Sequence, residues 1–232
     1  MTEPLDPVPG LILLDLDDTL CDYSAARDRR LRIALSGATG LTEDAAELDA
    51  LVAASIAAHP HGADHFGDLL AQFGYTDSVR AQKAAAWYRA NRFHGLELFA
   101  DAVAVLGGLR FAGHGAPERP LGIITNGPAE VQREKVGLLR IRPLVDFVII
   151  SGEFGVAKPD PAIFHEALQR AGVAPEETVF VGDSVEHDIA GAHVSGLRTV
   201  WVNRHGTPWV ADGRAPDRQI RHIGQLPALI GR

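Results

Sequence analysis

The chain has 232 residues, 46% of them apolar, and its 22 Lys and Arg residues face 30 Asp and Glu, for a formal net charge of -8. A chain of this length can bury a hydrophobic core, as one large domain or as one domain with an insertion. The acidic balance argues against nucleic acid as the main partner, because neutralising its backbone requires a basic face. A small phosphorylated substrate needs only a local positive pocket and is compatible with this charge.

The cysteine content and the N-terminal sequence indicate a compartment. Cys21 is the only cysteine, which excludes an intramolecular disulfide and a zinc cluster of thiolates. The first residues are acidic and contain prolines, without the basic start and apolar stretch of a signal peptide. No apolar run approaches the length of a membrane span. We therefore expect a cytoplasmic protein with no membrane partner, present as a monomer or a homodimer.

Short apolar runs rich in β-branched residues predict the strands of a parallel sheet covered on both faces. The predicted strands are residues 11–14, 121–124, 147–150, 178–181 and 199–202. Amphipathic stretches between the later runs predict helices at residues 128–138, 161–170 and 185–194. This alternation is typical of an α/β fold with a doubly wound, Rossmann-like parallel sheet.

Residues 22–98 have a different character. They carry almost no strand signal and are rich in Ala, Leu, Arg and Glu, which predicts about four helices. We interpret them as an all-helical cap domain inserted after the first strand of an α/β core made of residues 1–21 and 99–232. Residues 112–120 are predicted to form a surface loop ahead of the second strand.

Two carboxylates, Asp15 and Asp17, directly follow the first strand. Ligands of open α/β sheets bind beyond the carboxyl ends of the strands, so both residues lie at the favoured place. In continued strand geometry, residues two apart face the same side. The alternative is a polar turn with a capping aspartate, which is about as common for a lone Asp-x-Asp.

Polar residues also follow the second and third strands. Thr125 and Asn126 precede a helix start, where a hydroxyl, an amide and backbone N–H groups can cradle a phosphate. Taken alone, they would be an ordinary helix cap. Lys158 precedes Asp160, which has a proline on each side. The prolines restrict the backbone, and a rigidly held lysine suits a phosphate dianion.

The fourth strand ends in Gly182, with Asp183 beside it and Asp188 five residues later. Acidic oxygens near the first carboxylate pair would repel one another unless a cation lay between them. A small set of hard oxygen ligands completed by water suits Mg²⁺. Each of the four stretches is weak evidence, but together they converge in order on one edge of one sheet.

On these four stretches the chain resembles the haloacid dehalogenase-like (HAD) superfamily of hydrolases, over residues 10–21 and 99–205. The run of residues 125–135 is similar to the phosphatase branch, and residues 22–98 stand where that family has its helical C1 cap. The resemblance implies that Asp15 is the nucleophile, forming an aspartyl-phosphate. It implies that Asp17 is the general acid and then the general base.

The resemblance also implies a magnesium site and a phosphate site. Mg²⁺ would bind the Asp15 side chain, the Asp17 backbone carbonyl and the Asp183 side chain, with Asp188 as a direct or water-mediated ligand. The phosphoryl oxygens would be held by Thr125, by the Asn126 backbone and by Lys158, which also offsets the repulsion between nucleophile and phosphate.

Asp17 discriminates among the reactions of the family. Dehalogenases lack an acid two residues after the nucleophile, since a halide leaves without a proton. The sequence therefore predicts a phosphatase for a small phosphorylated metabolite, a nucleotide or a sugar phosphate. A phosphomutase would keep the same four motifs, and a non-hydrolytic phosphoacceptor or binding module is a further alternative.

Two polar clusters lie in the predicted cap. His59, His61 and His65 flank Pro60 and Gly62, which favours a flexible turn, with a metal site or a substrate contact as alternatives. The basic residues of the first cap helix are predicted to form a solvated face: Arg27, Arg29, Arg30 and Arg32.

Overall fold

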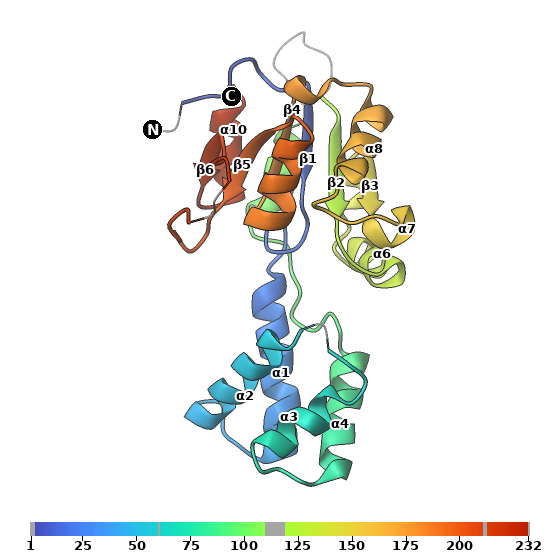
Figure 1. Cartoon of the computed structure of the whole chain (residues 1–232), viewed down its shortest axis with the longest axis vertical. Helices are drawn as coiled ribbons and strands as arrows, with labels where there is room; N and C mark the ends of the chain where they lie inside the picture. The colour runs from blue at the N-terminus through green and yellow to red at the C-terminus, as the bar shows by residue number, and fades with distance from the viewer. Residues whose placement is uncertain (1–2, 60, 110–118, 211–212, 232) are drawn as a thin grey trace. The chain divides into compact units, whose positions relative to one another are not determined.

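The structure, a computed structural model, describes residues 3–59, 61–109, 119–210 and 213–231. It forms two compact units, an α/β unit of Met1–Asp22 with Leu98–Arg232 and a helical unit of Tyr23–Glu97 (Figure 1). Residues 112–118 of the predicted surface loop, and Pro60 of the predicted histidine turn, lie outside the described residues. Over the described residues, no helix is both long enough and apolar enough to cross a membrane.

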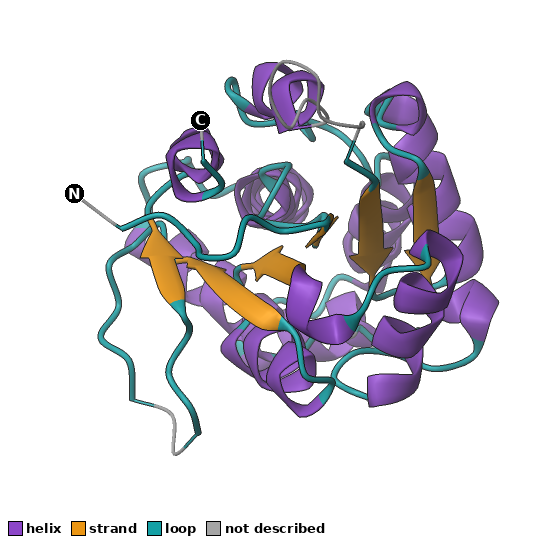
Figure 2. Ribbon diagram, turned by 90° about the horizontal axis from the view of Figure 1, so that it is seen from above, coloured by secondary structure: helices purple, strands orange, loops and turns teal. Residues whose placement is uncertain are grey.

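The α/β unit is built on a six-stranded sheet with the order β3-β2-β1-β4-β5-β6, and every neighbouring pair is parallel. Its strands are drawn in orange in Figure 2. The strands are β1 (Leu11–Leu14), β2 (Leu121–Thr125), β3 (Phe147–Ile150), β4 (Thr178–Gly182), β5 (Arg198–Val202) and β6 (Arg218–Ile220). The prediction of a doubly wound parallel sheet is confirmed.

Helices cover both faces of this sheet. They are α5 (Ala102–Leu109), α6 (Ala129–Leu138), α7 (Ser151–Phe154), α8 (Pro161–Ala171), α9 (Gly191–Val194) and α10 (Leu226–Leu229). Helix α8 shows why the chain begins and ends a helix where it does. The Asp160 side chain accepts from the Ala162 N–H, Pro161 takes the first helical position, and Gly172 ends the helix at φ 65°. Its buried face packs on the sheet, where the Phe164 and Phe180 rings meet edge to face at 5.2 Å.

Two elements of the α/β unit differ from the sequence prediction. The strand β6 was not predicted, because Arg218–Ile220 has no apolar run. The single helix predicted over residues 185–194 is a π-helical turn, Val185–Ala190, followed by α9. The wide turn arises because the N–H groups of Asp188 and Ile189 both donate to the Ser184 carbonyl. Such π turns are rare and frequently occur at functional sites.

The helical unit has four helices, α1 (Tyr23–Thr39), α2 (Ala46–Ala57), α3 (His65–Gln72) and α4 (Ser78–Ala90). Its core joins leucines of α1 and α2 to Phe66, and α4 contributes small residues, Ala81, Ala84 and Ala85, to the same cluster. Helix α1 packs on α4, and Asp77 caps α4 by accepting from the N–H groups of two residues in its first turn.

The solvated face predicted for the α1 arginines is wrong for Arg30, which is 4% exposed. Its Nε donates to the Ala26 carbonyl, and its guanidinium lies over the Tyr88 ring, 5.1 Å from the centroid. A guanidinium is weakly hydrated and stacks readily on aromatic rings, which explains its burial. Arg32 behaves as predicted, with surface ion pairs to Asp28 and Asp49.

Candidate active site

The carboxyl ends of three neighbouring strands bring the predicted motifs together in the α/β unit. Leu14, the last residue of β1, pairs with Val181 of β4 on one side and with Ile123 of β2 on the other. Asp15 continues β1, with its N–H donating to the Val181 carbonyl at 2.9 Å. Thr125 ends β2 and Asp183 follows β4, so residues far apart in sequence meet at one edge of the sheet.

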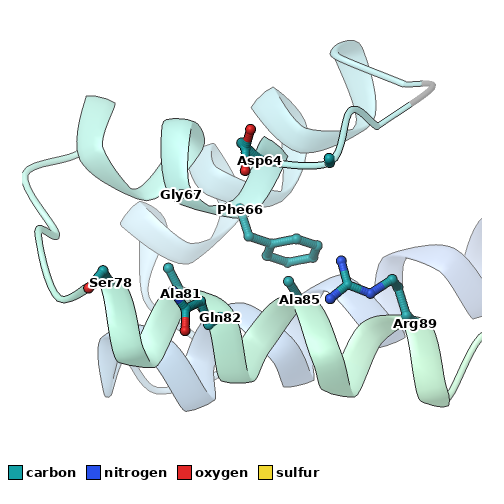
Figure 3. A pocket seen from close by; sticks show the side chains of 9 residues that line it. Asp64, Phe66, Gly67, Ser78, Ala81, Gln82, Ala85 and Arg89 are labelled. Carbon is teal, nitrogen blue, oxygen red and sulfur yellow. The ribbon is translucent and has the colours of Figure 1, made fainter.

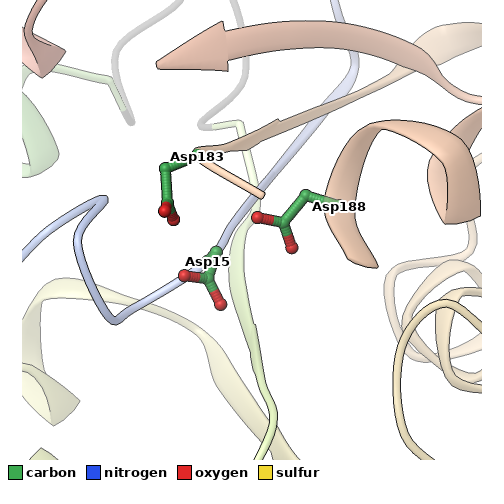
Figure 4. A group of neighbouring side chains, drawn as sticks. All are labelled: Asp15, Asp183 and Asp188. Carbon is green, nitrogen blue, oxygen red and sulfur yellow. The ribbon is translucent and has the colours of Figure 1, made fainter. Parts of the chain in front are cut away.

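Three carboxylates form the centre of the site. Asp15, Asp183 and Asp188 each offer an oxygen, and these oxygens lie within 4.8 Å of one another (Figure 4). Asp15 is 7% exposed and Asp188 is 1% exposed. Among the residues that the structure describes, this is the one group that gathers three acidic, histidine or cysteine ligand atoms so closely.

Lys158 is the cation that faces this group. It is 3% exposed, and its Nζ donates to Asp15 Oδ1 at 2.5 Å and to Asp188 Oδ1 at 2.6 Å. Asn126 fixes its backbone, accepting from the Lys158 N–H at 2.9 Å and donating from Nδ2 to the Lys158 carbonyl at 2.8 Å. The Asn126 side chain therefore holds the backbone of Lys158 in place. The loop that carries Lys158 is thus restrained by Asn126 as well as by the prolines beside Asp160.

The pKa values of these groups reflect burial first and the neighbouring charges second. Burial raises the pKa of Asp15 well above its usual value, against the opposing effect of Lys158, and Asp188 and Asp183 raise it further. Burial, with Asp188 and Asp18 nearby, raises the pKa of Asp183 to about 7. Burial alone would lower the pKa of Lys158, but the charges of Asp15 and Asp188 outweigh it and raise the value. Three clustered carboxylates with one lysine fit a divalent cation that prefers oxygen ligands, such as Mg²⁺.

The position of Asp188 depends on the glycine of the fourth motif. A Cβ added to Gly182 would overlap the Asp188 carboxylate, so any larger residue would displace it. The Ser184 N–H donates to Asp188 Oδ2 at 2.9 Å, inside the π-helical turn. The close approach of backbone and carboxylate is thus the structural reason for a glycine at the end of β4.

Asp17 lies outside this group of three carboxylates and has a different partner. Its two oxygens are 2.7 and 2.6 Å from Lys135 Nζ, and Oδ2 also accepts from Gln132 Nε2 at 3.3 Å. Gln132 Nε2 donates as well to Thr125 Oγ1, at 2.5 Å. Gln132 and Lys135 had no predicted role, because polar residues on a helix normally face solvent.

Two further residues without a predicted role support the loop after β1. Thr19 donates from Oγ1 to Asp183 Oδ1 at 3.1 Å, joining the first motif to the fourth. Arg204 donates to the carbonyls of Asp18 and Thr19, and its guanidinium stacks on the Phe99 ring, 3.4 Å from the centroid. Arg204 also lines a pocket of about 120 Å³ beside Asp183. No local pattern in the sequence predicts these contacts, because they join residues far apart along the chain.

The histidines of the helical unit do not form a comparable metal group in the described part of the chain. His61 and His65 stack with ring centroids 3.9 Å apart, and both approach Ser55 Oγ with Nε2, at 3.3 and 2.8 Å. Burial lowers the pKa of each of them, as it does for His59, which favours neutral imidazoles. We interpret the three histidines as a packed polar cluster.

A pocket of about 310 Å³ lies between α3 and α4 of the same unit, lined largely by small residues around Phe66, with Asp64 and Arg89 at its edge (Figure 3). None of the residues predicted to do chemistry lines it. The pocket therefore adds nothing to the catalytic constellation of the α/β unit.

Comparisons with known proteins agree with this geometry. The model of the haloacid dehalogenase-like hydrolase family matches residues 9–196. A glyceraldehyde 3-phosphate phosphatase of Methanopyrus kandleri is 36% identical over 93% of this chain and 90% of its own length. A phosphoserine phosphatase of Thermus thermophilus is also 36% identical, over 69% of this chain and 61% of its own length.

Among solved structures, the HAD-hydrolase YfnB of Bacillus subtilis, bound to magnesium, has a TM-score of 0.73 with 24% identity, covering 96% of this chain and 98% of that one. This likeness confirms the fold. The chain belongs to the haloacid dehalogenase-like hydrolases, and its resemblance to their phosphatase branch is confirmed.

Proposed function

We propose that this phosphatase is a Mg²⁺-dependent phosphate-monoester hydrolase that works through an aspartyl-phosphate on Asp15. The observation that carries the proposal is the group of Asp15, Asp183 and Asp188 oxygens at the carboxyl ends of the strands, with Lys158 paired to Asp15 and Asp188. Asp15, Asp183 and the Asp17 backbone carbonyl would hold the metal, with Asp188 in support. When bound, Mg²⁺ supplies positive charge that offsets the repulsion between the phosphate dianion and the nucleophile.

The chain's own residues account for the two steps of hydrolysis. In the first, an Asp15 oxygen bonds to phosphorus, the bond to the leaving oxygen breaks, and Asp17 gives that oxygen a proton. In the second, Asp17 takes a proton from a water molecule while the water oxygen bonds to phosphorus. The bond between phosphorus and the Asp15 oxygen breaks, which releases the Asp15 carboxylate and free phosphate. Lys158, Thr125 and the Asn126 N–H hold the phosphoryl oxygens, which carry most of the charge in the transition state.

The substrate that we propose is a small phosphorylated metabolite, a nucleotide or a sugar phosphate. The names of the relatives, which specify glyceraldehyde 3-phosphate and phosphoserine, support a compact phosphate monoester. We further propose that the helical unit, residues 22–98 in the sequence prediction, is the cap that selects this substrate. Asp17 favours hydrolysis over dehalogenation, because only an alkoxide needs its proton.

Phosphate release from a panel of such compounds tests the proposal. The panel should contain glyceraldehyde 3-phosphate, phosphoserine, hexose phosphates and nucleoside monophosphates, each assayed with Mg²⁺ and with EDTA. We expect release from at least one compound with Mg²⁺ and almost none with EDTA. A product with the phosphoryl group moved within the substrate, and no free phosphate, would instead identify a phosphomutase. Phosphate retained on Asp15 without turnover would identify a phosphoacceptor.

The raised pKa values predict how stability changes with pH and Mg²⁺. The folded-state pKa of Asp183, about 7, exceeds the ordinary value of 3.8. The metal-free protein therefore keeps a proton that the unfolded chain releases, and the resulting stability is lost as pH rises through about 7. Because Mg²⁺ binds the ionised carboxylates, we expect saturating Mg²⁺ to raise the melting temperature more at about pH 8 than at about pH 5.5.

This experiment should compare unfolding with and without Mg²⁺ at each pH. The lowered pKa values of His59, His61 and His65 act in the opposite direction, making the chain more stable as pH rises. Their contribution cancels in the difference between the two conditions, since they lie outside the carboxylate group. A Mg²⁺ effect of equal size at both pH values would argue against metal binding at these carboxylates.

A further inference from the structure

Helix α6 directs two buried polar side chains at the site. Gln132 and Lys135 are each 2% exposed and lie three residues apart, on one face of the helix. Both contact Asp17, and Gln132 also contacts Thr125. The start of the helix is fixed in turn, because the Gly127 N–H donates to Ser151 Oγ at 2.9 Å and the Gly127 carbonyl accepts from the Gly152 N–H at 3.1 Å.

The two lysines of the site have separate partners. Lys158 donates to Asp15 and Asp188, whereas Lys135 donates to both oxygens of Asp17, at 2.7 and 2.6 Å. A buried ammonium is costly unless it is paired and hydrogen-bonded, so this contact determines where Asp17 can lie. The Asp17 side chain is itself 25% exposed, and without a partner it would sample several rotamers.

We propose that Lys135 is a positioning residue for Asp17. The inference rests on the proposed function, in which Asp17 is the acid and then the base. Lys135 contacts both oxygens of the carboxylate and so fixes its orientation, while Gln132 links the same carboxylate to the Thr125 hydroxyl. Helix α6 thus fixes the position of the Asp17 carboxylate, which transfers the proton, relative to the Thr125 hydroxyl, which binds phosphate.

This role makes the effect of Lys135 depend on the leaving group. When an alkyl phosphate reacts, the leaving oxygen needs a proton from Asp17 as its bond to phosphorus breaks. When p-nitrophenyl phosphate reacts, the nitrophenolate is stable and leaves without that proton. The second step, in which Asp17 takes a proton from water, is common to both substrates. A misplaced Asp17 should therefore slow the first step only for the alkyl phosphate, and the second step for both.

The test compares Lys135→Met, Lys135→Arg and wild type in the full-length protein with Mg²⁺. Pre-steady-state and steady-state kinetics should use the alkyl phosphate that wild type hydrolyses best, and p-nitrophenyl phosphate. For Lys135→Met we expect phosphoryl transfer from the alkyl phosphate to slow about 10- to 100-fold, a part of the usual effect of general acid catalysis. Transfer from p-nitrophenyl phosphate should change by less than about threefold, giving a burst of nitrophenolate before slow turnover. Lys135→Arg should recover part of the loss.

Arg133→Met is the matched control, because Arg133 lies on the same helix with an exposed side chain paired to Glu153. It should leave both rates unchanged. An equal loss of the transfer step with both substrates, or a rise in KM with kcat unchanged, would overturn the proposal in favour of a structural or phosphate-binding lysine. If Lys135→Met does not fold, Lys135→Gln carries the same expectation. Turnover that survives Asp15→Asn would reject the proposed function itself. That result does not depend on the Lys135 variants, so the two failures can be told apart.

Discussion

Replacing Asp15 with asparagine should abolish turnover while leaving the protein folded. An amide has almost no nucleophilicity toward phosphorus, so we expect kcat to fall by at least about a thousandfold. Asparagine has nearly the same shape and can still accept from Lys158 Nζ, which contacts Asp15 Oδ1 in the wild type. The loss would therefore report on chemistry and not on packing. Phosphate release with the best substrate of the panel is the measurement.

The same substitution should not lower stability in the absence of metal. The pKa of Asp15 is raised, first by burial and then by Asp188 and Asp183, so its ionised form is disfavoured in the folded state. Removing this charge relieves the repulsion, and the melting temperature at about pH 8 without Mg²⁺ should equal or exceed that of wild type. Mass spectrometry of acid-quenched wild type should find a phosphoryl group on Asp15.

Asp77→Asn is the matched control for this experiment. Asp77 caps α4 in the helical unit, and asparagine is also a favourable cap, so neither activity nor stability should change. Turnover by Asp15→Asn within about tenfold of wild type would exclude a covalent intermediate on this residue. A fall in stability as large as the fall in activity would mean that Asp15 is mainly a structural residue.

The sheet could be predicted because its strands are specified locally. Leu11–Leu14 and Thr178–Gly182 are buried along their whole length, and a run of apolar residues announces that burial in the sequence. Parallel strands present their carboxyl ends at one edge, so the polar residues after each run had to converge there. Strand β6 was not predicted, because Arg218–Ile220 lies at the sheet edge, is only partly buried and contains no apolar run.

The partners of the candidate site residues could not be predicted in the same way. Lys135 lies 118 positions from Asp17, and in the sequence it is one charged residue among several on an amphipathic helix. Arg204 is likewise 186 positions from the Asp18 carbonyl that it contacts. Such pairs depend on which face of a helix or loop meets the sheet edge. Local periodicity indicates an element, but it does not show which polar side chain an inward face will bury.

Lys158 should have the largest effect on stability, because its removal leaves two buried carboxylates without their cation. Asp15 and Asp188 are 7% and 1% exposed, and Lys158 Nζ lies within 2.6 Å of an oxygen of each. For Lys158→Met without Mg²⁺, we expect the free energy of unfolding to fall by about 3–5 kcal/mol, the usual cost of breaking a buried ion pair. Denaturant unfolding at neutral pH measures it, and turnover should be lost as well.

Two comparisons separate the charge effect from the change of side chain. Lys83→Met makes the same replacement at an exposed position of α4, and it should change stability by less than about 0.5 kcal/mol. In the Asp15→Asn background, Lys158→Met leaves only the Asp188 carboxylate without its cation. It should therefore destabilise the chain by less than in wild type. Equal destabilisation in both backgrounds would mean that the lysine acts through its packing. Because Mg²⁺ supplies the missing positive charge, its stabilisation of Lys158→Met should exceed that of wild type, provided the carboxylates keep their positions.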